Sequence, residues 1–179
     1  MESILEEVRG NNEDINEKYD LLLKELGTET PLPEEQLMKV FPKNMGVFNL
    51  DASDNGNNNP RITSDETVVG SFGEGKVRIE ILDAAGKNVM GAILPLKMLH
   101  LNKITSELNN TIRYSKKERN GILTFCTDRD EAVGADYESD IRFLYDDRFY
   151  VILEGKMMDT DALWQAFDIN ALKGYKDMN

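Results

Sequence analysis

The strongest hydrophobic pattern in the chain is a strand, predicted at 149–153, that is apolar on both faces. Its side chains alternate between the faces, with Phe149, Val151 and Leu153 on one and Tyr150 and Ile152 on the other. A similar run at 141–145 precedes it, and the polar residues 146–148 between the two runs predict a hairpin. Because apolar side chains are stabilised by leaving water, the second strand is expected inside a sheet that is covered on both sides.

Other strands are predicted earlier in the chain. The candidates are residues 67–72, 76–82, 111–114 and 121–127. In the first pair, Val77, Ile79 and Ile81 alternate with charged residues, so this hairpin is expected at the outside of the sheet with one face in water. Residues 115–119 are mostly charged and end at Asn120 and Gly121, which predicts a loop between the last two candidates.

Residues 2–26 have the composition of a helix and carry a narrow apolar stripe. The stripe consists of Leu5, Val8, Ile15, Tyr19, Leu22 and Leu26. Gly27, Pro31 and Pro33 then predict the end of the helix. Two interpretations stay open: the stripe packs on the rest of the protein, or it binds a partner, as in a short coiled coil.

Two further helical regions are predicted. The first carries Met90, Leu94 and Met98 at helical spacing and continues to Leu108, with Pro95 expected in its first turn because proline is tolerated there. The second lies near the C-terminus. Asp159 or Thr160 is expected to cap a helix that carries Leu163, Trp164 and Phe167, and Asp168 is expected to cap a last turn.

These elements predict an α+β fold with an antiparallel sheet of about five or six strands, helices packed on it and an N-terminal helical arm. The expected division is a helical arm at 1–27, a linker at 28–66 with a short helical turn and an Asn/Asp/Gly-rich loop, and an α+β domain at 67–179. The element order, with its aromatic strand pair leading into a Leu-Trp helix, resembles the Mog1/PsbP-like α/β sandwich domains over residues 67–172. This resemblance implies a non-catalytic role in assembly or binding.

Charge and composition narrow the possible partners. Asp and Glu number 33 against 21 for Lys and Arg, and the net charge of −12 disfavours binding to nucleic acid. The sequence has no apolar run long enough to insert into a membrane, and its single cysteine, Cys126, gives no disulfide signature. We therefore expect a cytoplasmic protein, or a periplasmic or secreted one if a signal segment is missing from this sequence.

Two groups of oxygen-bearing side chains are weak candidates for a metal site. Asp51, Ser53 and Asn55 match the first half of a calcium loop, but Ile62 stands where the last carboxylate is needed. The second group is the acidic segment 128–140, represented by Asp128, Asp130 and Asp136. Both segments are also typical of solvated loops, and no metal or cofactor is expected.

No catalytic set stands out. His100 is the single histidine, and Cys126 is expected to lie within a strand, so a Cys–His dyad is disfavoured. The sequence therefore favours a non-enzymatic binding or assembly module that engages a protein partner or self-associates through the stripe at 5–26. The alternatives are an acidic inhibitor or immunity-type protein that neutralises a basic partner, and an enzyme of unrecognised type that uses the loop from Asp128 to Asp140.

Overall fold

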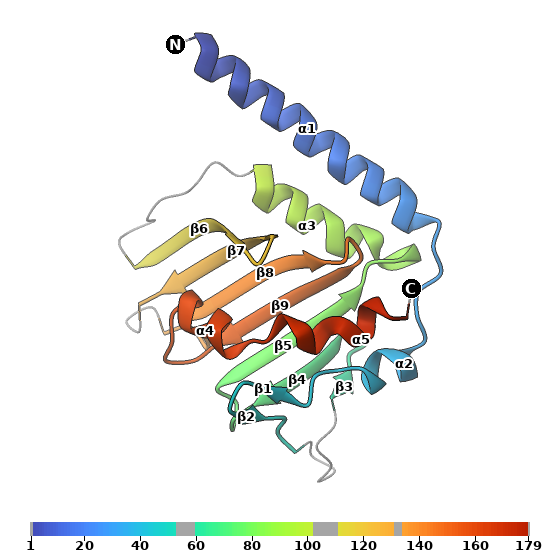
Figure 1. Cartoon of the computed structure of the whole chain (residues 1–179), viewed down its shortest axis with the longest axis vertical. Helices are drawn as coiled ribbons and strands as arrows, with labels where there is room; N and C mark the ends of the chain where they lie inside the picture. The colour runs from blue at the N-terminus through green and yellow to red at the C-terminus, as the bar shows by residue number, and fades with distance from the viewer. Residues whose placement is uncertain (1, 53–59, 102–110, 131–133, 179) are drawn as a thin grey trace.

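The protein is built on a seven-stranded antiparallel sheet with helices on both faces (Figure 1). The computed structural model describes residues 2–52, 60–101, 111–130 and 134–178, except for the side chains of residues 2–11. The sheet has the strand order β3-β4-β5-β9-β8-β7-β6, and a separate two-stranded ribbon pairs β1 with β2. The predicted α+β class is therefore confirmed, with a sheet that is larger than expected.

The strands of the sheet are β3 (Arg61–Ile62), β4 (Val68–Phe72), β5 (Val77–Asp83), β6 (Ile112–Arg119), β7 (Ile122–Arg129), β8 (Ser139–Tyr145) and β9 (Phe149–Gly155), and the ribbon consists of β1 (Asn44–Met45) and β2 (Phe48–Asn49). The α-helices are α1 (Glu2–Gly27), α2 (Glu34–Lys39), α3 (Val89–Leu101), α4 (Thr160–Ala166) and α5 (Lys173–Lys176). Two 3₁₀ turns, η1 (Gly86–Asn88) and η3 (Ile169–Leu172), precede α3 and α5.

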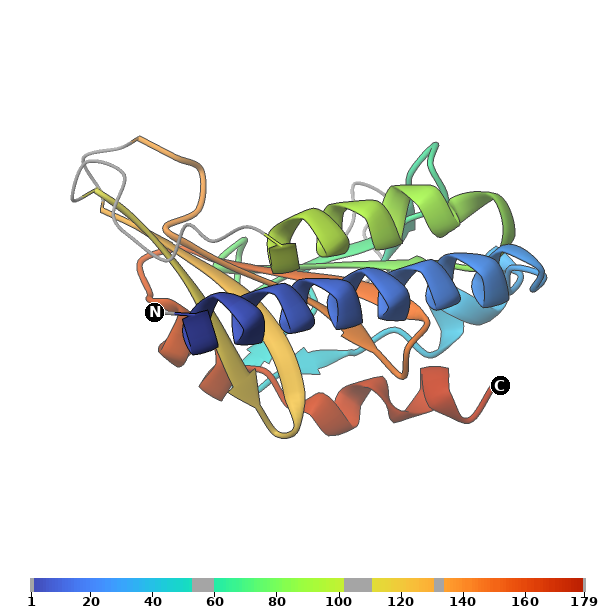
Figure 2. The same ribbon diagram turned by 90° about the horizontal axis from the view of Figure 1, so that it is seen from above.

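The doubly apolar strand is β9, the middle strand of the sheet. Val151 and Leu153 are fully buried on one face. Tyr150, 6 % exposed, and Ile152 pack on the opposite face. The prediction that this strand is covered on both sides is therefore confirmed, and it explains why the molecule has a helical layer above and below the sheet (Figure 2).

The larger core lies on the face covered by α2, α4, η3 and α5. Leu163 of α4, Leu172 of η3 and Tyr175 of α5 are completely buried there against the sheet. The caps follow the sequence prediction, because Asp159 accepts a hydrogen bond from the backbone of Ala162 and Asp168 accepts one from Asn170.

The segment predicted as a linker also contributes to this core. Phe41 is 2 % exposed, and Leu37, Met45 and Leu50 are equally buried in the same cluster. A Cβ atom at Gly70 of β4 would lie 2.5 Å from the Phe41 ring, so glycine lets this ring approach the sheet. The division into arm, linker and domain stays a prediction, but the described part of residues 28–66 contributes buried side chains to the core of the sheet.

Two strand predictions were wrong in detail. Residues 115–119, expected to form a loop, belong to β6, which is the edge of the sheet, where charged side chains can point into water without cost. The hairpin of β4 and β5 was expected at the outside, yet β5 pairs with the central β9. The polar residues of β5 are accommodated because Arg78 forms ion pairs with Glu80 and with Glu154 of β9.

The position of Pro95 was also wrong. It was expected in the first turn of a helix, but α3 begins at Val89 and places Pro95 in its interior. The buried side of α3, with Ala92, Ile93 and Leu96 at most 1 % exposed, holds the helix in place and outweighs the unfavourable proline. The predicted continuation to Leu108 falls on 102–110, outside the described residues.

A buried ion pair joins the N-terminal part of the chain to the end of the sheet. Asp83, 1 % exposed, binds Arg148 through two contacts of 2.8 and 3.0 Å. Arg148 also donates to the Glu29 carboxylate and the Thr30 carbonyl, and Asp83 accepts from the backbone of Leu32. This network fixes the connection between α1 and α2 on the turn between β8 and β9.

Replacing Asp83 by Asn should lower the free energy of unfolding by about 3 kcal/mol, because the mostly buried Arg148 charge loses its buried carboxylate partner and keeps only the exposed carboxylate of Glu29. Urea unfolding of the full chain measures this change. Asp130→Asn is the matched control: it removes the Asp130–Arg113 pair, whose side chains are about half exposed, and should cost at most about 1 kcal/mol. Equal losses for the two variants would contradict a special role for Asp83.

Candidate binding surface

The second half of α1 packs on α3 within the same molecule. Tyr19, Leu22 and Leu26 are 4 to 8 % exposed, and Ile15 packs against the same cluster. Helices α1 and α3 lie side by side in both views, and the first turns of α1 extend past the end of α3 (Figures 1 and 2). The side chains of Leu5 and Val8 lie in these first turns, outside the described side chains, so partner binding by the stripe stays a prediction for them.

A polar contact between Tyr19 and His100 lies at the α1–α3 junction. The Tyr19 hydroxyl is 3.0 Å from Nδ1 of His100, and the ring of His100 also contacts Phe125 of β7. Burial raises the pKa of Tyr19 to about 12. Burial, followed by the nearby charges of Lys116 and Lys18, lowers the pKa of His100. The structure therefore favours a neutral imidazole beneath α1.

The outward face of α3 is apolar along its whole length. Met98 is 72 % exposed and Met90 is 55 % exposed, and Leu94 and Pro95 lie on the same face and are partly exposed. The two polar residues of the helix are elsewhere: Lys97 pairs with Asp20 of α1 at 3.0 Å, and His100 contacts Tyr19. We call Met90, Leu94, Pro95 and Met98 the outer α3 surface. A helix that is apolar on all sides is typical of one that is covered on all sides.

An open hollow of about 600 Å³ adjoins this surface at the C-terminal end of α3. Pro95, Met98, Leu99 and Leu101 line it together with Arg142 of β8. Two side chains of the sheet position Arg142: its guanidinium lies 3.6 Å from the Asp140 carboxylate and 3.4 Å from the Tyr150 hydroxyl. The apolar surface therefore continues from the ridge of the helix into a depression whose floor is polar.

Acidic side chains of α1 lie beside the C-terminal end of the outer α3 surface. Glu13, Glu17 and Asp20 are exposed and have the spacing of one helix face. The ion pair with Lys97 places Asp20 beside α3, and because the two helices are antiparallel, Glu17 and Glu13 lie farther toward and past the C-terminal end of α3. We call these three residues the α1 acidic row. The acidic row thus begins beside the Met98 end of this uncharged, methionine-rich helix face.

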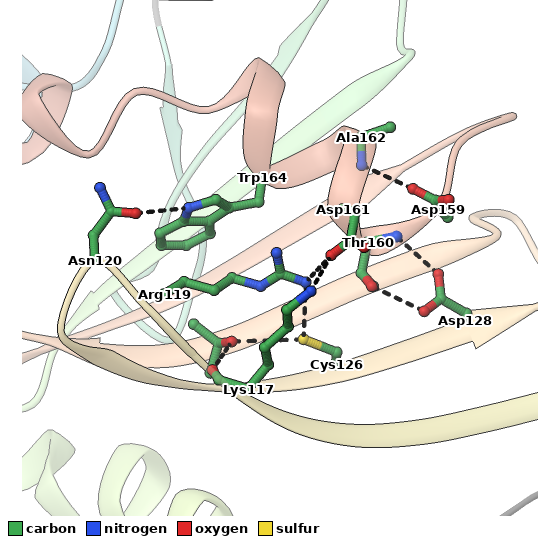
Figure 3. Close-up of polar contacts among 11 residues, drawn as sticks. Lys117, Arg119, Asn120, Cys126, Asp128, Asp159, Thr160, Asp161, Ala162 and Trp164 are labelled. Atoms are coloured by element: carbon green, nitrogen blue, oxygen red, sulfur yellow. Dashed lines mark hydrogen bonds and ion pairs between the residues drawn. The ribbon is translucent and has the colours of Figure 1, made fainter.

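A second polar cluster, at the other face of the sheet, attaches α4 to strands β6 and β7 (Figure 3). Asp161 of α4 accepts from Lys117 at 2.8 Å and from Arg119 at 2.7 Å. Their charges lower the pKa of Asp161, chiefly through these hydrogen bonds. Asp128 accepts two bonds of 2.8 Å, from the backbone and from the hydroxyl of Thr160. These contacts are explained by the docking of α4.

Cys126 is part of this cluster and lies apart from His100. The thiol, 2 % exposed, is 3.6 Å from the Thr124 hydroxyl and 3.9 Å from Nη2 of Arg119. His100 contacts Phe125, whose side chain points to the opposite face of the same strand. The sheet therefore separates the thiol from the imidazole, in agreement with the expectation that they do not form a dyad.

The metal candidates are dispersed or lie outside the described residues. Ser53 and Asn55 belong to 53–59, which is not described, and Asp51 accepts from the backbone of Glu74 and Gly75 in the β4–β5 turn. In the acidic segment, Asp130 pairs with Arg113, and Asp136 is exposed. Within the described part of the chain, His, Cys, Asp and Glu form no group of three that could hold a metal ion.

The outer α3 surface was not identified in the sequence. The signal was present, because residues 89–96 contain no charged or polar side chain. The 3.6-residue pattern predicts one apolar face there, whereas the opposite face of α3 is also apolar. Uniform apolar character over a helix at the outside of a sheet was the available sign of a binding surface.

No family model, curated protein or solved structure matches the chain. In the part of the protein that the structure describes, no helix combines the length and the apolar character needed to cross a bilayer.

The lowered pKa of His100 predicts a pH-dependent stability. The unfolded state binds a proton at about the ordinary pKa of 6.5 and the folded state only at lower pH, so this stabilising contribution is complete above pH 6.5 and is lost as the pH falls below it. The urea midpoint should therefore decrease between pH 7.5 and 5.5, and by a smaller amount in His100→Gln. Identical pH dependence in the two proteins would contradict the neutral imidazole.

Asp128→Ala should destabilise the protein by about 2 kcal/mol, because two charge-assisted hydrogen bonds to Thr160 are lost. Asp130→Ala and Asp136→Ala should each change stability by about 0.5 kcal/mol or less, as is usual for exposed side chains. Chemical unfolding of the three variants measures the difference. A result in which Asp128→Ala matches the other two would show that α4 docks without this carboxylate.

Proposed function

We propose that the protein is a non-enzymatic binding or assembly module, and that the outer α3 surface is the site where a protein partner docks. The observation that carries this proposal is the exposed, uncharged face of Met90, Leu94, Pro95 and Met98. Exposed apolar patches on soluble domains are typical of interaction sites. Methionine is well suited to such a site because its flexible side chain adapts to the shape of the partner.

Burial of part of the α1 stripe supports the outer α3 surface, rather than the stripe, as the docking site. The last three positions of the stripe are buried against α3, so a partner could reach them only if α1 left the sheet. Deletion of residues 1–27 would not separate the two docking sites, because it would remove the α1 stripe and also expose the core beneath it. Substitutions on the outer α3 surface test the proposal without this complication.

A second candidate function is the acidic inhibitor that neutralises a basic target. The α1 acidic row and the net charge of −12 favour it. It differs from an apolar docking module in its salt dependence: added salt should dissociate a charge-driven complex and leave an apolar one largely intact. The third interpretation, an enzyme that uses the Asp128–Asp140 loop, stays a prediction; Asp128, Asp130 and Asp140 make structural contacts.

Site-specific photo-crosslinking tests the docking function. A benzophenone amino acid at position 98 of the full chain, in the cells that make it, should give a crosslinked product of defined mass. The same group at position 157 is the matched control, because Met157 is 84 % exposed and lies outside the outer α3 surface. A defined product at 98 and none at 157 is expected; no defined product at 98, or the same product at both, would contradict the proposal.

A further inference from the structure

We infer that the partner of the outer α3 surface is a basic amphipathic helix of another protein, which lies beside α1 and α3 as a third helix. This inference rests on the proposed function and specifies its ligand. It combines an apolar helical ridge with an acidic row that begins beside the Met98 end of the ridge, and both are formed by described side chains.

The shape of the site fits a helix. The outer α3 surface presents Met90, Leu94 and Met98 at spacings of four residues, so its apolar side chains form a straight ridge. From Met90 to Met98 this ridge spans about 12 Å at 1.5 Å per residue, which corresponds to about two turns of a partner helix. The hollow lined by Pro95, Leu99 and Leu101 can accept a larger apolar side chain at one end.

The charges beside the ridge favour a partner of positive charge. Glu13, Glu17 and Asp20 repeat at the spacing of helical turns, and Asp20 pairs with Lys97 close to Met98 of α3. A helix with leucines on one face and lysines at its border would bury the former on Met98 and place the latter near these carboxylates. Lys97 is already paired with Asp20, so it does not cancel the attraction of Glu13 and Glu17.

A second copy of this chain fits the surface poorly. Each copy carries a net charge of −12, and an interface between two outer α3 surfaces would also bring two acidic rows together. Like charges next to a new contact oppose association, whereas a basic helix relieves the existing excess of carboxylates. Charge complementarity therefore selects a basic partner over self-association.

Titration of the full chain with two labelled peptides tests this inference. The first peptide is a 14-residue amphipathic helix of Leu and Lys, and the second has the same Leu positions with Glu in place of Lys. Fluorescence anisotropy should detect binding of the Leu/Lys peptide and at least tenfold weaker binding of the Leu/Glu peptide. Met98→Glu should weaken the Leu/Lys complex at least tenfold; this residue is exposed, so the fold should be retained.

A charge-matched pair of triple variants identifies the acidic row. Glu13→Gln, Glu17→Gln and Asp20→Asn together should weaken binding of the Leu/Lys peptide about tenfold at about 0.1 M salt. The control combines Glu34→Gln, Glu35→Gln and Asp136→Asn, exposed residues outside the acidic row that change the net charge equally. The control should bind within about twofold of the unchanged protein, because distant exposed charges are screened beyond about 10 Å.

The outcomes separate this inference from the proposed function. Binding of the Leu/Glu peptide as tightly as the Leu/Lys peptide, with loss in Met98→Glu, would overturn the basic partner and keep the docking surface. Equal weakening in the two triple variants, or no binding of the Leu/Lys peptide, would also overturn the basic partner. Photo-crosslinking at position 98 would then still decide whether the surface docks any protein.

Discussion

The need to cover β9 on both faces is the constraint from which the rest of the architecture follows. Its apolar side chains alternate without a polar side, so each face of the sheet requires its own layer of apolar residues. One face obtains this layer from α4, α5 and the segment around Phe41. The other face obtains it from α3, which in turn is held by the second half of α1. The helix proposed as the docking site is therefore first of all a structural cover.

The two helical layers differ in completeness. The face under α4 and α5 is closed by many short elements, with buried polar groups such as the Tyr175 hydroxyl bonded to the carbonyl of Leu37. On the opposite face, α3 is covered by the sheet and by α1 but by nothing on its outer side among the described residues, where Met98 stays 72 % exposed. A layer that is apolar on a side open to water is the physical basis for proposing a partner there.

The sequence predicted the parts of the fold that depend on local pattern. The burial of β9, the extent of α1 and the caps at Asp159 and Asp168 follow from alternation, helix formers and short polar side chains. The extent of the edge strand β6 and the position of β5 in the sheet depend instead on which strands become neighbours. The position of Pro95 inside α3 depends on tertiary packing that outweighs the local preference of proline. The outer α3 surface has a sign in the sequence, the uninterrupted apolar run at 89–96, but such a run does not show whether the residues that cover it come from the same chain.

Methionine methyl NMR tests the central claim most directly, because the chain carries its own probes on and off the proposed surface. In protein labelled at its methionine methyl groups, addition of the Leu/Lys peptide should shift the resonances of Met90 and Met98. The resonances of Met45, which is fully buried, and Met157, which is 84 % exposed elsewhere, should stay unchanged. Shifts at Met157 without shifts at Met90 and Met98 would contradict the account.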